Sequence, residues 1–122
     1  AHHKVRTEFW GYAAKESLDN EAFIKEEYQG IRPAPGYPSC PDHRLKNDIW
    51  DLLDVEQKIN ISLTDSLAMW PTASVSGLYF SHPQSRYFQL GRIDKDQVEA
   101  YSKSRGESID ENETWLSPVL GY

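Results

Sequence analysis

The amino-acid sequence predicts an α+β fold: helices first, then an antiparallel β-hairpin that belongs to a larger sheet, then C-terminal helices. In the first half of the chain, apolar residues recur at helical spacings of three and four, whereas residues 74–80 are rich in β-formers. Within the first half, positions 31–43 hold four prolines and a glycine, which excludes a helix or a central strand there. With 122 residues, the chain is expected to form one domain or part of one.

Two helices are predicted before the proline-rich stretch. Val5, Phe9 and Tyr12 are spaced by four and three positions, with charged residues between them. This spacing predicts an amphipathic helix over His3–Lys15. A second helix fits Asn20–Tyr28.

A third helix is predicted from about Asp42, which can cap it, to Asp54. A short helical continuation is expected through Val55 and Ile59. The apolar stripe expected to face the core consists of Leu45, Ile49, Leu52 and Leu53, widened by Trp50.

The β-structure is expected later in the chain. Residues 61–64 alternate with period two, and Val75–Ser81 and Ser85–Leu90 flank His82-Pro83-Gln84, a pattern typical of a hairpin. Adjacent strand residues face opposite sides, so we expect one of Tyr87 and Phe88 to point into the core and the other away from it. Hydrophobic core remains the alternative reading for the aromatic residues of this region.

Two helices are predicted to close the chain. Asp94 can cap a helix that runs to Ser104, with Gly106 as its stop. A shorter helix is expected over Glu111–Leu116, ending at Pro118.

Composition restricts the possible partners. The net charge is −6, and no basic patch is visible, so we expect no nucleic-acid partner. No apolar run approaches the ~18 residues that span a bilayer, so we expect no membrane insertion. The single cysteine, Cys40, fits a reducing compartment, and we expect a cytoplasmic location.

The proline-rich stretch is the first candidate ligand site. Its prolines preset the backbone, Arg32 offers a planar fork for a carboxylate or phosphate, and Gly36 allows a positive φ or a close backbone approach. Tyr37 adds a phenol beside them. The alternative is a purely structural connection between two helices.

Metal binding and nucleophilic catalysis find weaker support. Cys40, Asp42 and His43 lie close together, but a structural zinc site usually takes two ligand pairs, so we expect no metal. Asp42 as a helix cap and His43 in a first turn explain both residues without chemistry. A small hydrolase using Cys40 and His43 stays an alternative, although no nucleophile-elbow motif or phosphate-binding glycine loop is present.

Five motifs occur in order: R-P-A-P-G-Y-P (32–38), C-P-D-H (40–43), I-W-D-L-L (49–53), A-M-W-P-T-A-S-V-S-G-L-Y-F-S-H-P (68–83) and S-R-Y-F (85–88). Together they closely resemble the C-terminal activation domain of cobalamin-dependent methionine synthase. The likeness extends from Val5 to the C-terminal W-L-S-P-V-L-G-Y. Several long motifs in the same order make a chance similarity improbable.

The resemblance implies that the chain binds S-adenosylmethionine (AdoMet) and supports reductive methylation of cob(II)alamin. Cobalamin would be bound by a neighbouring domain, and a flavodoxin-type partner would supply an electron. The cobalt is the nucleophile in this chemistry, so the resemblance implies no catalytic side chain. A non-catalytic module that docks a cobalamin domain or flavodoxin without binding AdoMet is the alternative function.

The resemblance also implies roles for individual residues. Arg32 would anchor the methionyl carboxylate, and backbone groups around Ala34 and Gly36 would meet the rest of the ligand. Tyr37 would lie on the side facing the cobalamin.

Tyr87 and Phe88 match the positions that complete the pocket in the family. The family's domain is longer, and an acidic contact for the AdoMet amino group precedes the position of residue 1. We therefore expect residues 1–122 to be the C-terminal part of a single activation domain, inactive by themselves and with weakened affinity for AdoMet.

Overall fold

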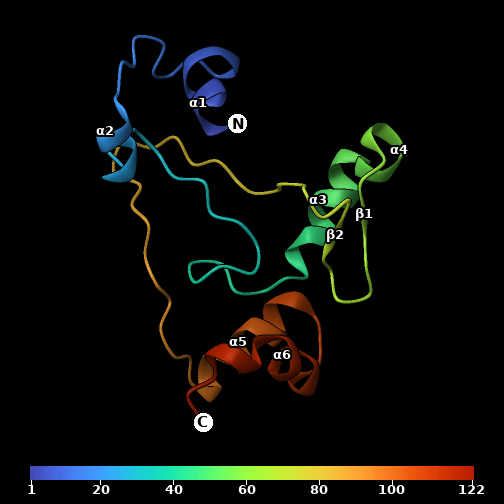
Figure 1. The fold of residues 1–122 in the computed structure, drawn as a ribbon. Helices are drawn as coiled ribbons and strands as arrows, with labels where there is room; N and C mark the ends of the chain where they lie inside the picture. The colour runs from blue at the N-terminus through green and yellow to red at the C-terminus, as the bar shows by residue number, and fades with distance from the viewer. The chain divides into compact units, whose positions relative to one another are not determined.

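Two separate stretches of chain make up each of two units in the computed structural model, which describes residues 1–122 (Figure 1). Unit 1 comprises Ala1–Pro33 and Gly77–Tyr87, and unit 2 comprises Ala34–Ser76 and Phe88–Tyr122. Helices and one two-stranded antiparallel sheet confirm the predicted α+β class. No helix combines the length and the apolar character needed to cross a bilayer.

Unit 1 begins with two short helical segments, α1 (His2–Lys4) and the π-helix η1 (Val5–Phe9). The prediction of one helix over His3–Lys15 was wrong in length, because Gly11 adopts a φ of +66° and the chain turns there. The buried residue of η1 is Arg6, whose exposed fraction is 2%. The helical face therefore buries a charge that needs a partner.

The second helix, α2 (Asn20–Ile24), begins as predicted and ends early. Asp19 caps it, since its Oδ1 accepts the Ala22 N–H at 2.9 Å. Glu26 adopts a left-handed φ of +57°, which a continuing helix cannot accommodate, so the predicted extension to Tyr28 was wrong.

The predicted hairpin between residues 75–81 and 85–90 does not form, because the N-terminal part pairs with a distant segment. Phe80 exchanges backbone hydrogen bonds with Ile31 (2.9 and 3.0 Å), and the Leu78 N–H donates to the Pro33 carbonyl (2.8 Å). The turn itself exists, since the Ser85 N–H donates to the His82 carbonyl (2.9 Å). Residues 85–90 form no strand.

Unit 2 contains α3 (Leu45–Leu53) and α4 (Val55–Ile59), separated by Asp54 at a φ of +53°. Lys46 and Trp50, one turn apart, are the buried residues of α3. The expected apolar stripe was wrong in part, because Leu52 and Leu53 are 84% and 55% exposed.

The sheet of unit 2 pairs β1 (Ser62–Leu63) with β2 (Met69–Trp70). Ser62 lies opposite Trp70, so the strand predicted in residues 61–64 forms, but the predicted alternation does not, because Ile61, Ser62 and Leu63 are all half-buried. The Trp50 indole N–H donates to the Ile61 carbonyl at 2.7 Å, which fastens the start of this sheet to α3.

The C-terminal helices pack together in unit 2 and follow the sequence prediction closely (Figure 1). The helix α5 (Lys95–Arg105) begins after Asp94, whose N–H donates to the Gln97 side chain at 2.9 Å, and ends at Gly106 with a φ of +70°. The helix α6 (Ile109–Leu116) leads into η2 (Ser117–Val119). A core between them holds Ile93, Val98 and Leu116, with Tyr101, Ile109, Val119 and Leu120 packed against it.

Candidate functional site

The backbone pairing of unit 1 positions Arg32. Ile31 and Pro33 are buried and hydrogen-bonded to residues 78–80, whereas Arg32 between them is exposed, as the alternation of an extended chain requires. The Arg32 N–H donates to the Tyr87 hydroxyl at 2.9 Å. The guanidinium takes part in none of the ion pairs of the chain, so it is free to bind an anion.

A pocket of about 300 Å³ lies at Arg32 in unit 1. A second guanidinium in its wall, that of Arg6, is committed to Glu16 through two hydrogen bonds of 2.7 and 2.5 Å and lies 4.5 Å from the centre of the Tyr28 ring. Arg32 is therefore the arginine of this pocket whose charge is not already paired with a carboxylate. The remaining lining residues are Ala1, His2, His3 and Phe23.

Two titratable side chains of the pocket wall, those of His2 and Tyr28, are held neutral. Burial, followed by the charges of Arg6 and Arg32, lowers the pKa of His2 to about 4. The His2 ring packs on Tyr28 and Tyr79, at centroid distances of 5.0 and 5.3 Å. Burial, and next the Tyr87 phenol, raises the pKa of Tyr28 to about 12. At pH 7 the pocket therefore combines aromatic walls with cationic arginine.

A compact turn in unit 2 carries three further predicted residues. The Gly36 N–H donates to the Cys40 carbonyl (2.7 Å), and the Cys40 N–H donates to the Tyr37 carbonyl (2.8 Å). The Tyr37 N–H in turn donates to the Ala34 carbonyl (3.2 Å). Tyr37 is 65% exposed at the tip of this turn.

Gly36 adopts a φ of +97°, so of the two alternatives predicted here, a positive φ or a close backbone approach to a ligand, the structure has the first. A Cβ added here would overlap the imidazole of His43, with Cε1 the nearest atom. The His43 ring is therefore one reason why position 36 requires glycine, and the expected approach of a ligand is a second.

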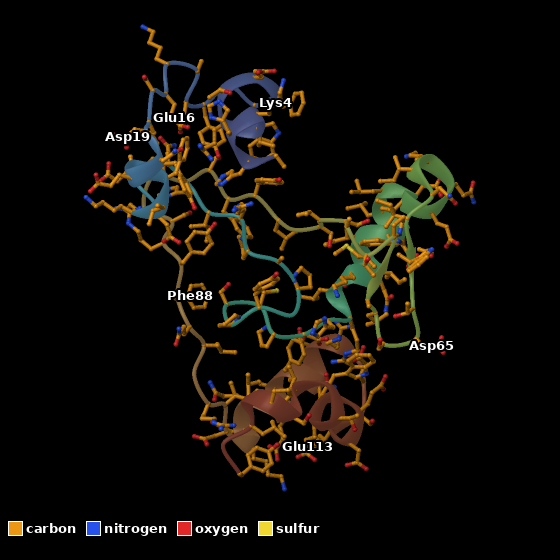
Figure 2. The ribbon with its side chains drawn as sticks, viewed as in Figure 1. Lys4, Glu16, Asp19, Asp65, Phe88 and Glu113 are labelled. Atoms are coloured by element: carbon orange, nitrogen blue, oxygen red, sulfur yellow. The ribbon has the colours of Figure 1, made fainter.

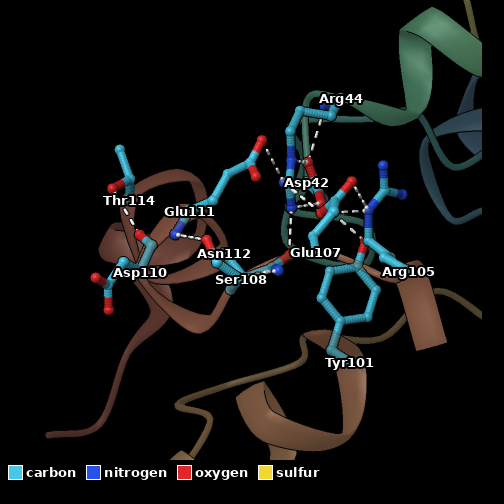
Figure 3. A network of polar contacts seen from close by, with 10 residues as sticks. All are labelled: Asp42, Arg44, Tyr101, Arg105, Glu107, Ser108, Asp110, Glu111, Asn112 and Thr114. Carbon is cyan, nitrogen blue, oxygen red and sulfur yellow. Dashed lines mark hydrogen bonds and ion pairs between the residues drawn. The ribbon is translucent and has the colours of Figure 1, made fainter. Parts of the chain in front are cut away.

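A buried polar network fastens the segment after this turn to the C-terminal helices (Figure 3). Asp42 accepts three hydrogen bonds from Arg44, from its backbone N–H, Nε and Nη2, at 2.8, 3.0 and 2.7 Å. Arg44 also reaches Glu107 (2.7 Å) and Asn112 (2.6 Å), and the Tyr101 hydroxyl donates to Asp42 (2.8 Å). Asp42 precedes α3 rather than capping it directly.

Cys40 has the properties of a structural thiol. Burial, and next the charge of Asp42, raises the pKa of the Cys40 thiol, so the nucleophilic thiolate is disfavoured at neutral pH. The chain contains no group of three His, Cys, Asp or Glu side chains that could hold a metal ion.

The structure brings the predicted residues together within each unit. Arg32 and Tyr87 are hydrogen-bonded in unit 1, and Ala34, Gly36 and Tyr37 share one turn in unit 2.

Phe88, labelled in Figure 2, belongs to unit 2. It is 56% exposed, whereas the preceding Tyr87 is half-buried. The expectation that one of the two rings points into the core was wrong, because residues 85–90 form no strand and neither ring is buried. Sequence reasoning missed Tyr28 as a wall of the Arg32 pocket and His43 as the neighbour of Gly36. No local sequence pattern predicts the contact of His43 with Gly36, because the two residues are seven positions apart and no helix or strand connects them.

Comparison with known proteins gives the family. The family model described as the activation domain of vitamin B12 dependent methionine synthase matches residues 1–106. The chain therefore belongs to the vitamin B12 dependent methionine synthase activation domain family.

A solved structure is also similar, and it is described as a crystal structure of the MetH reactivation domain bound to AdoHcy. It is 57% identical to this chain, with a TM-score of 0.93, and the match covers 99% of this chain. This chain spans 37% of the length of that solved chain.

Proposed function

We propose that this chain binds AdoMet and, within the family's enzyme, supports the reductive methylation of cob(II)alamin that restores activity. The observation that carries the proposal is its likeness to a reactivation domain described as bound to AdoHcy. AdoHcy lacks only the sulfonium methyl group of AdoMet, so both ligands offer a protein the same carboxylate, amino group and adenosine.

Arg32 is the proposed anchor for the ligand carboxylate. Its guanidinium is exposed and has no ion-pair partner in the chain, and its backbone is fixed by pairing on both sides. A planar guanidinium can bind a carboxylate through two parallel hydrogen bonds, an arrangement that a lysine cannot reproduce.

The other proposed ligand contacts are Ala34, Gly36, Tyr37, Tyr87 and Phe88. Glycine lets the backbone approach a ligand closely, and the neighbouring prolines hold that backbone in one shape. The exposed rings of Tyr37 and Phe88 offer aromatic surface to an adenine, a sulfonium or a cobalamin.

The proposed reaction requires the protein to position the methyl group of AdoMet and requires no proton transfer by a side chain. Bound AdoMet supplies a methyl group on a positively charged sulfur, and the protein's task is to orient it. We propose that the residues described above do this in the C-terminal part of a single activation domain. A neighbouring domain would bind the cobalamin, and a flavodoxin-type protein would provide the electron.

Equilibrium dialysis of isotopically labelled AdoMet against the intact protein tests the proposal. Saturable binding at one site, displaced by AdoHcy, is the expected result. Absence of binding by a folded protein that still associates with a cobalamin-binding domain would instead assign the chain to docking alone.

A further inference from the structure

We propose that His43 is a positioning residue for the turn of Gly36 and Tyr37, which its ring supports at the α-carbon of Gly36. The inference rests on the proposed function, because that function assigns this turn to AdoMet.

The contact with Gly36 is the first argument. The His43 ring fills the place where any other residue at position 36 would carry its Cβ, and Cε1, Nδ1 and Nε2 are the three nearest atoms. Gly36 also has a positive φ of +97°, a conformation that residues with a Cβ rarely adopt, so the backbone and the ring both require glycine here. Three backbone hydrogen bonds between residues 34 and 40 close the turn on itself. Movement of the ring would therefore be transmitted directly to the backbone beside Tyr37.

The second argument is that His43 is itself held in place. Lys46 Nζ lies 3.0 Å from His43 Nδ1 and donates to the Leu67 carbonyl at 2.6 Å. Lys46 is 6% exposed, and an ammonium group can only donate, so Nδ1 acts as acceptor on a neutral ring. Leu67 is buried in the connection between β1 and β2. A line of contacts thus runs from the sheet of unit 2 through Lys46 and His43 to Gly36.

The charge environment supports the neutral ring. Burial, and then the charge of Lys46, lowers the pKa of His43, and Asp42 opposes this effect. A role for His43 as the base of a cysteine nucleophile does not fit, because Nδ1 is occupied by Lys46 and the thiol of Cys40 is kept protonated.

A double-mutant cycle tests the proposal, with AdoHcy affinity measured by calorimetry on the intact protein. His43→Ala should weaken binding about tenfold, within the range of coupling seen for residues in contact. Gly36→Ala should weaken binding as well. In the double variant the missing ring leaves room for the new Cβ. The loss of affinity in the double variant should therefore be at least about threefold smaller than the product of the two single-variant losses.

A conservative variant separates positioning from general stability. His43→Asn keeps a flat group and an acceptor oxygen for Lys46, so its affinity should return to within about threefold of the wild type. His82→Ala removes an exposed histidine of unit 1 that accepts only from the Gln84 N–H, and it should leave affinity unchanged. If His43→Ala fails to fold, His43→Ser takes its place in the cycle, since its small side chain leaves the same room for a Cβ at position 36 and its hydroxyl can accept from the buried Lys46.

The outcomes are distinct. Wild-type affinity in folded His43→Ala, or losses that multiply independently, would overturn the positioning role while leaving the proposed function intact. Failure of the wild-type protein to bind AdoHcy, or full binding by Arg32→Ala, would overturn the proposed function first.

Discussion

Replacing Asp42 by asparagine should destabilise the C-terminal helices of unit 2. The Asp42 side chain is 4% exposed, and its two oxygens accept from Arg44 and from the Tyr101 hydroxyl. Burial by itself would raise the pKa of Asp42, but the hydrogen bonds from Arg44 and Tyr101 outweigh it and hold the pKa below its usual range. The carboxylate is therefore charged and paired in the folded chain.

The expected cost follows from what remains after the substitution. An asparagine amide has one acceptor oxygen, so the Arg44 Nη2 and the Tyr101 hydroxyl lose the acceptor they share. Removing one partner of a buried ion pair costs about 3–5 kcal/mol. Arg44 keeps Glu107 at 2.7 Å and Asn112 at 2.6 Å, which places our expectation at about 3 kcal/mol, the lower end of that range.

Native-state hydrogen exchange on the intact protein measures this cost locally. The amides of Val98 and Ser102, both buried in α5, should exchange about a hundredfold faster in Asp42→Asn, since each 1.4 kcal/mol is about tenfold.

Glu111→Gln is the matched control for Asp42→Asn. The Glu111 carboxylate lies 3.9 Å from Arg44 on a side chain that is 54% exposed, so the change should cost less than about 1 kcal/mol. Equal protection in the two variants would refute the argument that the buried carboxylate holds the helices to the segment around Arg44.

Two further predictions concern titration. The imidazole of His2 should titrate in an NMR experiment with a midpoint at about 4, and a pKa at the ordinary value of 6.5 would contradict its burial. Since the folded pKa lies below the unfolded one, the stability that neutral His2 contributes is complete above pH 6.5 and is lost as the pH falls towards 4. The thiol of Cys40, the chain's only cysteine, should react with iodoacetamide more slowly at pH 7 than a free thiol, because its pKa is raised by burial. Reaction at the rate of a free thiol would show that the thiol is neither buried nor shifted.

The sequence predicted those parts of the fold whose causes are local. Asp94 and Gly106 mark the ends of α5, and the structure places a cap and a left-handed residue at these positions. The end of a helix near Asp54 and a short helical continuation through Val55 and Ile59 were also expected, and the structure has both. Such signals act over one or two helical turns and are visible in a single sequence.

The errors arose where distant residues decide the structure. Phe80 pairs with Ile31, which lies 49 positions earlier, and no sequence feature near Phe80 predicts this pairing. The exposure of Leu52 was missed because Lys46 and Trp50, bound to the Leu67 and Ile61 carbonyls, provide the buried face of α3.

In the candidate site, too, some features could be predicted from the local sequence and others depend on packing between distant residues. Arg32, Gly36 and Tyr37 stood out through composition, since prolines, a glycine and one arginine in a short stretch suit an anionic ligand. The ion pair of Arg6 with Glu16 and the contact of His43 with Gly36 depend on side-chain packing across irregular chain, so the sequence contained no pattern for them.

Calorimetric titration of AdoMet into the intact protein, wild type against Arg32→Ala, tests the central claim most directly. A charge-assisted contact is worth about 1.5–3 kcal/mol, so Arg32→Ala should weaken binding at least about tenfold, and Arg32→Lys should recover little of the loss. Arg86→Ala serves as the control, because Arg86 is exposed and bonds only to the neighbouring carbonyls of Pro83 and Ser85. Unchanged affinity in a folded Arg32→Ala protein would contradict the claim that this guanidinium holds the carboxylate of AdoMet.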